Sequence, residues 1–527
     1  MNPRRIVLVS SIAVVSFVSG GWLLQRPEQQ GDGNVYQRAR LFDDILSTVA
    51  EYYVDTLPET KLYDLAIEGM MDQINDPYTA YLKKDARDDL TLTVTGNYAG
   101  IGAQIDSRDN YITVVTPLPD TPGERAGIVA GDLIVGVDTE STAGWSVDQA
   151  THHMRGVAGT HVKLRIMRAG VRDTIRLDIT RAPIHVNAVE GGTLLTPTIA
   201  YVKLNQVSDQ ATAELAASID SLRLAGAKSL VFDLRGNTGG ILQEGVTLGN
   251  LFVDAPKVIV ETRGRAPGES EMFRATRPAR WPGMPIVVLV NEFTASSAEI
   301  LSGALQDHDR GLILGTQTFG KGVAYQVFNL SNTEAVSVTT SRWYTPSGRT
   351  IDRGHVRHQL LRQDTTGKEQ DSSVFRTDMG RKLKGGGGIQ PDVLLAPDTL
   401  TTAEQKMAKA LGSKVPDFRN ALAAYALDLK TAGTVTQRDF TVTNAMITEL
   451  LTRLRARGIT MPDSLWYPAK GIISQQLGYD IARYVYGRAA ELKRRNQEDN
   501  QVRRAVQLLQ GARTMAELLR VPGPGDK

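Results

Sequence analysis

The chain contains no cysteine among its 527 residues. This absence excludes disulfide bonds, thiolate nucleophiles, cysteine-bound zinc and lipidation of an amino-terminal cysteine. Net charge is nearly absent too, because 60 lysines and arginines stand against 58 aspartates and glutamates, which leaves +2. No overall field therefore favours nucleic acid as a partner. Histidine is scarce, with 7 residues, so a serine nucleophile has few imidazoles to use as its base.

What is present fits a folded protein of three or four domains, with 41% hydrophobic and 22% charged residues. Residues 6–24 carry no charge and as a helix would span ~28 Å, close to the hydrocarbon thickness of a bilayer. We expect a retained signal anchor there, with a cleavable signal peptide as the alternative. Arg4 and Arg5 would keep the amino terminus inside, which places the remaining chain on the periplasmic or other extracytoplasmic face of the inner membrane.

Hydrophobic periodicity and turn residues divide the chain further. The predicted regions are a signal anchor or signal peptide at 1–25, a linker at 26–34, N-terminal helices at 35–95, a β-rich module at 96–183, an α/β core at 184–400, helices at 401–520 and a disordered tail at 521–527. The core strands are predicted at 199–207, 230–234, 258–261 and 286–290. Their alternation with helices predicts a buried, largely parallel sheet.

One stretch, GTQTFGKGVAYQV at 315–327, has two incompatible interpretations. Gly315, Gly320 and Lys321 nearly form a phosphate-binding loop, in which the lysine stays charged and grips a nucleotide. Such a loop also needs a serine or threonine after the lysine and a helix behind it. Gly322 occupies the hydroxyl position and a strand-like sequence follows, so a nucleotide binder remains only a remote alternative.

Two further stretches each have a plain structural explanation. DLRGNTGGIL, at 233–242, is either a tight turn with Asp233 and Arg235 paired, or a glycine turn whose N–H groups bind an oxyanion. In the run IVVLVNEFTASSAEIL, Ser296 precedes Glu299 by three positions, as in a capping box. Ser296 is therefore either a helix cap or a nucleophile on a sharp turn.

The three stretches lie in order within one predicted parallel-sheet domain, and together they suggest serine chemistry with an unusual base. The sequence has no G-x-S-x-G elbow, and His308 is best explained as structural. A lysine can replace histidine when burial lowers its pKa toward neutrality. Lys321 lies between glycines and before an apolar strand, so we predict that it is the sheltered base of Ser296.

Five blocks, DLRGNTGGIL, VNEFTASSAEILSGALQD, TFGKG, RWYTPSGRTI and KGGGGIQPDV, carry a resemblance that extends over about 35–400. In this order the chain resembles the carboxy-terminal processing (tail-specific) proteases, which are serine peptidases with a Ser–Lys dyad on a crotonase-like α/β core. The resemblance implies that Ser296 is the nucleophile and Lys321 the base, with neither a metal nor a cofactor. The oxyanion donors that it implies are the amides of Gly239, Gly240 and Ser297.

One position departs from the family pattern. Family members often have a glutamine four residues after the lysine, thought to orient it, whereas this chain has Tyr325 there and Gln326 next. On a strand, Gln326 should point to the opposite face. Three explanations stay open: Tyr325 uses its hydroxyl, a bulge redirects Gln326, or the dyad works without a third member.

The β-rich module resembles the PDZ domain of the same family. The stretch ERAGIVAGDLIVGVD is typical of PDZ domains, and YAGIG matches their carboxylate-binding loop, where successive N–H groups accept a chain terminus. That loop would comprise Gly100, Ile101 and Gly102, with a generic glycine hairpin as the alternative for these residues alone. An extended peptide would then add as a strand beside a helix near Val147.

As a whole the sequence predicts a multidomain α/β serine endopeptidase of the cell envelope that recognises the C-terminal tails of proteins. Its partners would be proteins or peptides with exposed tails, the membrane at its amino-terminal segment and, as the family suggests, further copies of the chain. The alternative is not an enzyme but a catalytically impaired peptide-binding scaffold, which is suggested by the departure from the family pattern at Tyr325.

Overall fold

The structure is a computed structural model. It describes residues 35–108, 110–168, 171–331, 333–354 and 374–520. The predicted signal anchor, linker and C-terminal tail lie outside these ranges. None of the helices within them is long and apolar enough to cross a bilayer. The chain divides into two compact units, with the boundary between Ile74 and Asn75.

The described part of the first unit is a pair of helices, α2 (Val35–Tyr52) and α3 (Glu59–Ile74). The rings of Phe42 and Tyr63 lie 6.4 Å apart, and the Tyr63 hydroxyl donates a hydrogen bond to Asp43 over 3.1 Å. Both lie within the N-terminal helices that the sequence predicts at 35–95.

The second unit contains the β-rich module. Strands β2 (Asn97–Gly100) and β9 (Ala182–His185) pair where the chain enters and leaves it. Its antiparallel sheet has the order β3-β4-β5-β7-β8, with β6 beside β5. These elements and their helices are β3 (Ala103–Arg108), β4 (Tyr111–Pro117), α5 (Pro122–Arg125), β5 (Leu133–Val137), β6 (Glu140–Ser141), α6 (Val147–Met154), β7 (His161–Met167) and β8 (Ile175–Thr180). Strand β3 is an edge strand, and α6, the predicted helix, lies against it.

A six-stranded sheet of order β10-β11-β12-β15-β16-β21 forms the centre of the second unit. Strand β10 is antiparallel to β11, and the other pairs are parallel, as predicted. The strands are β10 (Val189–Thr196), β11 (Ile199–Leu204), β12 (Ser229–Asp233), β15 (Ile286–Val290), β16 (Leu312–Gly315) and β21 (Val393–Leu394).

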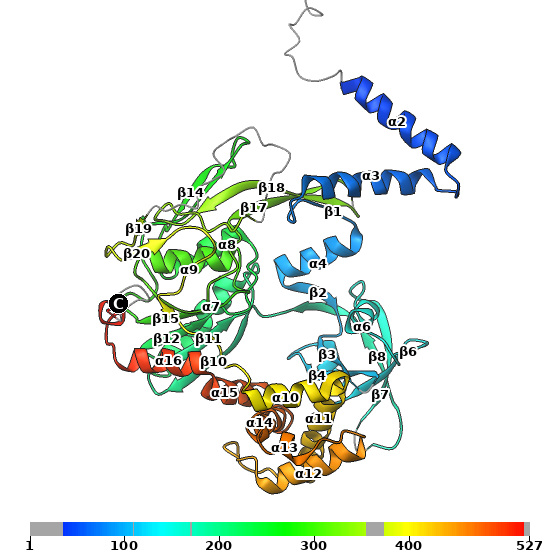
Figure 1. Cartoon of the computed structure of the whole chain (residues 1–527), viewed down its shortest axis with the longest axis vertical. Coiled ribbons are helices and arrows are strands. Elements are labelled where there is room, and N and C mark those ends of the chain that lie inside the picture. Colours follow the sequence, from blue (N-terminus) through cyan, green and yellow to red (C-terminus); the bar gives the residue numbers. More distant parts are fainter. Residues whose placement is uncertain (1–34, 109, 169–170, 332, 355–373, 521–527) are drawn as a thin grey trace, which may run out of the picture. The chain divides into compact units, whose positions relative to one another are not determined.

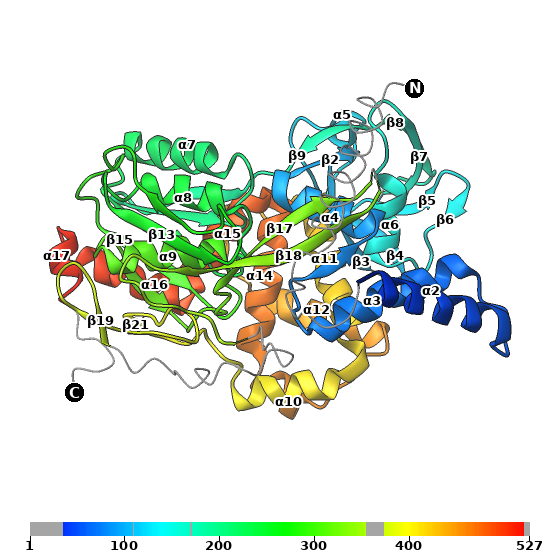
Figure 2. The ribbon, with the colours of Figure 1, turned by 90° about the horizontal axis from the view of Figure 1, so that it is seen from above.

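Both faces of this sheet are buried, because alternate side chains enter two different cores. In β15, Ile286, Val288 and Val290 face a core shared with α7 to α9, whereas Val287 and Leu289 face α16 and α17. Figure 2 shows α7 and α16 on opposite sides of the sheet. The covering helices are α7 (Ala211–Leu224), α8 (Leu242–Asn250), α9 (Ser297–Asp307), α16 (Asn500–Gln510) and α17 (Met515–Leu518). The end of the predicted C-terminal helical region therefore belongs to the core.

A second sheet is antiparallel, with the order β1-β18-β13-β14 and β17 beside β18. Its strands are β1 (Ala80–Leu82), β13 (Val258–Gly264), β14 (Glu271–Arg274), β17 (Val323–Asn329) and β18 (Ala335–Tyr344). The sequence placed 80–82 among N-terminal helices and 258–261 with the parallel strands, and the structure differs on both. The sequence of a short strand indicates its hydrophobic period but does not reveal which strand it pairs with, and the partner of Ala80 is Ser337, more than 250 positions later.

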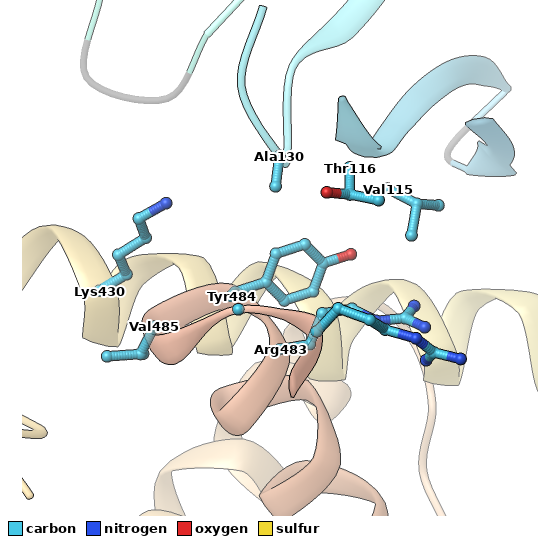
Figure 3. Close-up of a pocket in the computed structure, with 9 residues that line it drawn as sticks. Val115, Thr116, Ala130, Lys430, Arg483, Tyr484 and Val485 are labelled. Atoms are coloured by element: carbon cyan, nitrogen blue, oxygen red, sulfur yellow. The ribbon is translucent and has the colours of Figure 1, made fainter. Parts of the chain in front are cut away.

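Most C-terminal helices form a separate cluster with its own apolar core, coloured yellow to orange in Figure 1. They are α10 (Thr402–Leu411), α11 (Val415–Ala432), α12 (Asn444–Ala456), α13 (Asp463–Trp466) and α14 (Lys470–Tyr486), with η2 (Gly412–Lys414) between α10 and α11. Helix α15 (Arg488–Glu498) follows α14 without contributing to that core, and a small hairpin, β19 (Val374–Arg376) and β20 (Lys382–Lys384), precedes the cluster. Ala130 of the β-rich module packs against this core. Beside that contact is a cavity of about 200 Å³, where Val115 and Thr116 lie opposite Arg483 and Tyr484 (Figure 3).

Arg349, from the block RWYTPSGRTI, holds α9 through a fully buried guanidinium that donates to Asp307 (2.7 Å) and Gln306 (2.8 Å). We expect Arg349→Ala to lower the free energy of unfolding by ~3–5 kcal/mol, because it leaves the Asp307 carboxylate buried without its cation. Urea unfolding followed by circular dichroism measures the change. Arg342→Ala, at an exposed position of β18, is the matched control. A loss no larger than that of the control contradicts the role of Arg349.

Candidate active site

Ser296 occupies a strained turn between β15 and α9. Its backbone has φ 57° and ψ −124°, in a region that residues other than glycine rarely adopt. The side chain is half-buried at the amino-terminal end of α9. A serine held on such a strand-to-helix turn presents its hydroxyl outward, next to amides that the helix leaves unpaired. The conformation is more than a helix cap requires.

The Glu299 carboxylate, fully buried, ties the Ser296 turn to the Lys321 segment. One of its oxygens, Oε2, accepts the backbone N–H of Ser296 (2.9 Å) and that of Lys321 (3.0 Å). The other, Oε1, accepts the Gly320 N–H (2.7 Å) and the Thr318 hydroxyl (2.6 Å). The backbones of the predicted nucleophile and the predicted base therefore share a single acceptor atom.

Glu299 is ionised in this arrangement. Burial raises the pKa of its carboxyl, and the four donors oppose that rise. The Thr318 hydroxyl is fully buried, and among the described residues Glu299 Oε1 is the one acceptor for its hydrogen, so it is one of the donors, while its oxygen accepts the Ile389 N–H over 2.6 Å. A carboxylate has about four lone-pair positions, and here each receives a hydrogen, which leaves no place for a proton of its own. The sequence suggested only a capping role for Glu299, because partners about twenty residues away give no local signal.

The Lys321 side chain is enclosed by aromatic rings rather than by hydrogen-bonding groups. Its Nζ lies 4.2 Å from the ring centre of Tyr78 and 4.5 Å from that of Tyr325. Within the described part of the chain, Nζ has no hydrogen-bond partner. Burial lowers the pKa of Lys321 to about 8, although the charges of Glu299 and Asp76 favour the ammonium form. The amine can therefore lose its proton close to neutral pH.

Tyr325 contacts Lys321 through its ring face, while Gln326 points elsewhere. A register shift in the pairing of β17 with β18 occurs just before Tyr325. Gln326 is exposed, and its Nε2 donates to Glu269 over 2.7 Å. Among the described residues, the Tyr325 hydroxyl has no hydrogen-bond partner. Of the three explanations left open by the sequence, neither a bonded Tyr325 hydroxyl nor a redirected Gln326 occurs here.

The Lys321 segment is held by side chains that donate hydrogen bonds to its backbone carbonyls. The Trp343 indole donates to the Lys321 carbonyl over 2.9 Å, and Arg353 donates to the Thr318 carbonyl over 2.7 Å. At Gly388 a Cβ atom would lie 2.4 Å from the Thr318 oxygen, so the glycine run permits this close approach. Lys321 is followed by strand β17 and not by a helix, so the alternative prediction of a phosphate-binding loop is wrong.

The glycine turn after β12 lies directly against the candidate nucleophile. A Cβ at Gly239 would come within 2.7 Å of the Ser296 Cβ and 3.0 Å of the Ser297 nitrogen, so only glycine fits. The Gly239 N–H itself donates to the Asn237 side chain over 2.8 Å. Within the described ranges, the N–H groups of Gly240 and Ser297 have no acceptor. These two amides are therefore the donors open to a ligand, and Gly239 would have to release Asn237 to join them.

In the β-rich module, the turn at Gly100, Ile101 and Gly102 has the features of an anion site. Its carbonyls are used, since Ile101 accepts from the Gly123 N–H (2.7 Å) and Gly102 from the Thr121 hydroxyl (3.0 Å). In the region that the structure describes, the N–H groups of Ile101 and Gly102 have no acceptor. The turn leads into the edge strand β3, where an added strand could pair.

Known proteins resemble the chain throughout these regions. Residues 198–361 match peptidase family S41, residues 113–168 match a PDZ domain, and residues 24–86 match the activating protease CtpB N-terminal domain. The chain is 33% identical over 417 residues to the carboxy-terminal processing protease CtpA of Bacillus subtilis, spanning 78% of this chain and 84% of that protein. It is 34% identical over 349 residues to the carboxy-terminal-processing protease of Bartonella bacilliformis, spanning 64% and 80%.

We expect the Lys321 amine to titrate with a midpoint of about 8, measured by NMR of protein labelled at the lysine Cε. Lys321→Arg removes that resonance and so assigns it. Tyr325→Phe, which keeps the ring, should leave the midpoint unchanged. Tyr325→Leu should lower it by ~0.5–1 pH unit, because an apolar side chain without a π face no longer stabilises the ammonium. A midpoint at the ordinary lysine value of ~10.4 contradicts the enclosed state.

Proposed function

Because the chain belongs to the carboxy-terminal processing proteases of peptidase family S41, it is a serine-type peptidase with a PDZ domain, and we propose that Ser296 and Lys321 are its catalytic dyad. The shared Glu299 oxygen carries this proposal, because it fixes both backbones at one point. The strained turn of Ser296 and the lowered pKa of Lys321 support it independently.

In the proposed reaction, neutral Lys321 takes the hydroxyl proton of Ser296 while Oγ attacks the carbonyl carbon of the scissile peptide bond. The negative charge that develops on the carbonyl oxygen is stabilised by the amides of Gly240 and Ser297. The peptide C–N bond then breaks, and the Lys321 ammonium gives its proton to the leaving amine. Water attacks the acyl-enzyme carbonyl while Lys321 accepts its proton. The ester C–O bond then breaks, and Lys321 returns that proton to Ser296 Oγ, which restores the serine hydroxyl and the neutral amine.

The rings of Tyr78 and Tyr325 take the place of a hydrogen-bonding third member. They exclude water from the amine, which favours its neutral form, and their faces stabilise the ammonium that forms during the reaction. A scaffold without activity was the alternative because Tyr325 departs from the family pattern. A ring 4.5 Å from Nζ gives that departure a function, so the peptidase is favoured.

The PDZ domain is proposed to bind the C-terminal carboxylate of a protein substrate through the amides of Ile101 and Gly102, with the tail extended along β3. We further propose that the enzyme works on the extracytoplasmic side of the inner membrane, anchored by residues 6–24. The uncharged run and the arginines before it support that location.

Cleavage of a protein with an exposed, apolar C-terminal tail tests the dyad. Ser296→Ala and Lys321→Arg should each lose at least ~10³-fold in kcat, since one lacks the nucleophile and the other keeps a guanidinium that does not release its proton. For the unmodified enzyme, kcat/KM should rise with pH to half its plateau at about pH 8, where the amine becomes neutral. Wild-type cleavage no faster than that of Ser296→Ala would instead identify a scaffold.

A peptide substrate made with either a C-terminal carboxylate or a C-terminal amide tests the PDZ assignment. The amide should raise KM about tenfold or more and leave kcat nearly unchanged, because the carboxylate contacts the PDZ turn and not the reacting bond. Equal KM values for the two peptides would show that the turn does not read the chain terminus.

A further inference from the structure

Arg235 connects the glycine turn to the far end of the chain. Its Nε and Nη2 bind the buried carboxylate of Asp233, with Nη2 at 2.7 Å. Its Nη1 donates to two side chains more than 260 positions later, Asp499 (Oδ2, 2.8 Å) and Gln501 (Oε1, 2.7 Å). Opposite ends of one guanidinium are thus bound by β12 and by the start of α16.

Arg235 is the first residue of the turn that lies against the nucleophile. Two positions later, the carbonyl of Asn237 accepts the Ala295 N–H over 2.9 Å, next to Ser296. Gly239 packs on the Ser296 side chain at a separation that admits no Cβ. A displacement of Arg235 would therefore shift the glycine turn, and with it the position of the oxyanion amides relative to Ser296.

The two C-terminal side chains are themselves held in place. Asp499 caps α16 with Oδ1, which accepts the N–H groups of Gln501 (2.8 Å) and Val502 (2.9 Å), and this leaves Oδ2 for Arg235. Gln501 is 1% exposed, and its Nε2 donates to the Leu395 carbonyl over 2.6 Å. The Leu395 N–H in turn donates to the carbonyl of Gly315, where the segment leading to Lys321 begins. Gln501 thus contacts the supports of both loops of the site.

We infer that Asp499 and Gln501 are positioning residues for the peptidase reaction, acting through Arg235 on the oxyanion turn. This inference rests on the proposed function. It gives the end of the C-terminal helical region a role in the reaction, where the sequence predicted only helices.

The competing explanation is that these side chains merely dock α16. Apolar packing already does so, since Val502, Ala505, Leu508 and Leu509 enter the core beneath the parallel sheet. The contact with Arg235 can therefore be removed while the helix stays attached. Helix capping and contact with Arg235 also use different oxygens of Asp499, so substitutions can separate them.

Three substitutions of Asp499 make the test. Asp499→Ser keeps a good helix cap but is too short to reach Arg235, so we expect kcat to fall about ten- to a hundredfold with KM and Tm unchanged. Asp499→Asn keeps both the cap and a neutral acceptor, and should recover most of the activity. Asp499→Ala loses both and should lower kcat and Tm. Gln501→Leu, which keeps the volume of the buried side chain, should lower kcat in the same way.

Asn500→Ala is the matched control, because its Nδ2 also bonds the β21 segment, at Ala396 (2.9 Å), without contacting Arg235. It should leave kcat unchanged. Hydrogen exchange should show faster uptake over 234–242 in Asp499→Ser and no change over 500–510.

If Asp499→Ser retains the kcat of Asn500→Ala, and only Asp499→Ala loses activity together with Tm, Asp499 is a helix cap and the inference is overturned. Ser296→Ala in the same assay separates this result from a failure of the proposed function. Wild-type cleavage no better than that of Ser296→Ala would contradict both the proposed function and this inference.

Discussion

The site depends on one buried anion. The Glu299 carboxylate is sheltered from water, so its charge must be balanced by hydrogen bonds, and all four come from the two segments that form the site. A charge placed there in any other backbone arrangement would be left unsatisfied, at a cost of several kcal/mol. The same group keeps the strained turn of Ser296 and the loop of Lys321 together.

Lys321 is balanced between two opposed effects. Burial favours the neutral amine that can accept a proton, whereas Glu299, Asp76 and the faces of two tyrosines favour the ammonium. A pKa of about 8 lies between a permanently charged lysine and one too weakly basic to take a serine proton. Aromatic faces achieve this without a hydrogen-bond acceptor for the amine among the described residues. The tyrosine at 325 is thus consistent with catalysis.

The double burial of the central sheet brings the end of the chain to the site. Parallel strands such as IVVLV have apolar residues on both faces, and the second face must be covered by something. Here α16 supplies the cover, and its first turn meets Arg235 at the carboxyl end of β12. The same packing that completes the core therefore also places Asp499 and Gln501 beside the glycine turn.

The sequence by itself determined several local elements: four strands of the α/β core, the helix after Ser296, the glycine turn and the strand that follows Lys321, because periodicity, caps and turn residues act over a few positions. It also identified the family through five separated blocks. Tertiary structure alone decided that β1 and β13 join the antiparallel sheet and that Glu299 accepts the backbone N–H of Lys321. It also decided that Tyr78 and Tyr325 enclose the Lys321 amine, and that Asp499 contacts Arg235. Apart from that of Tyr325 with Lys321, these contacts join residues far apart in the chain, and their pairing is set by how the apolar faces of the elements are buried together, a property that no short window of sequence contains.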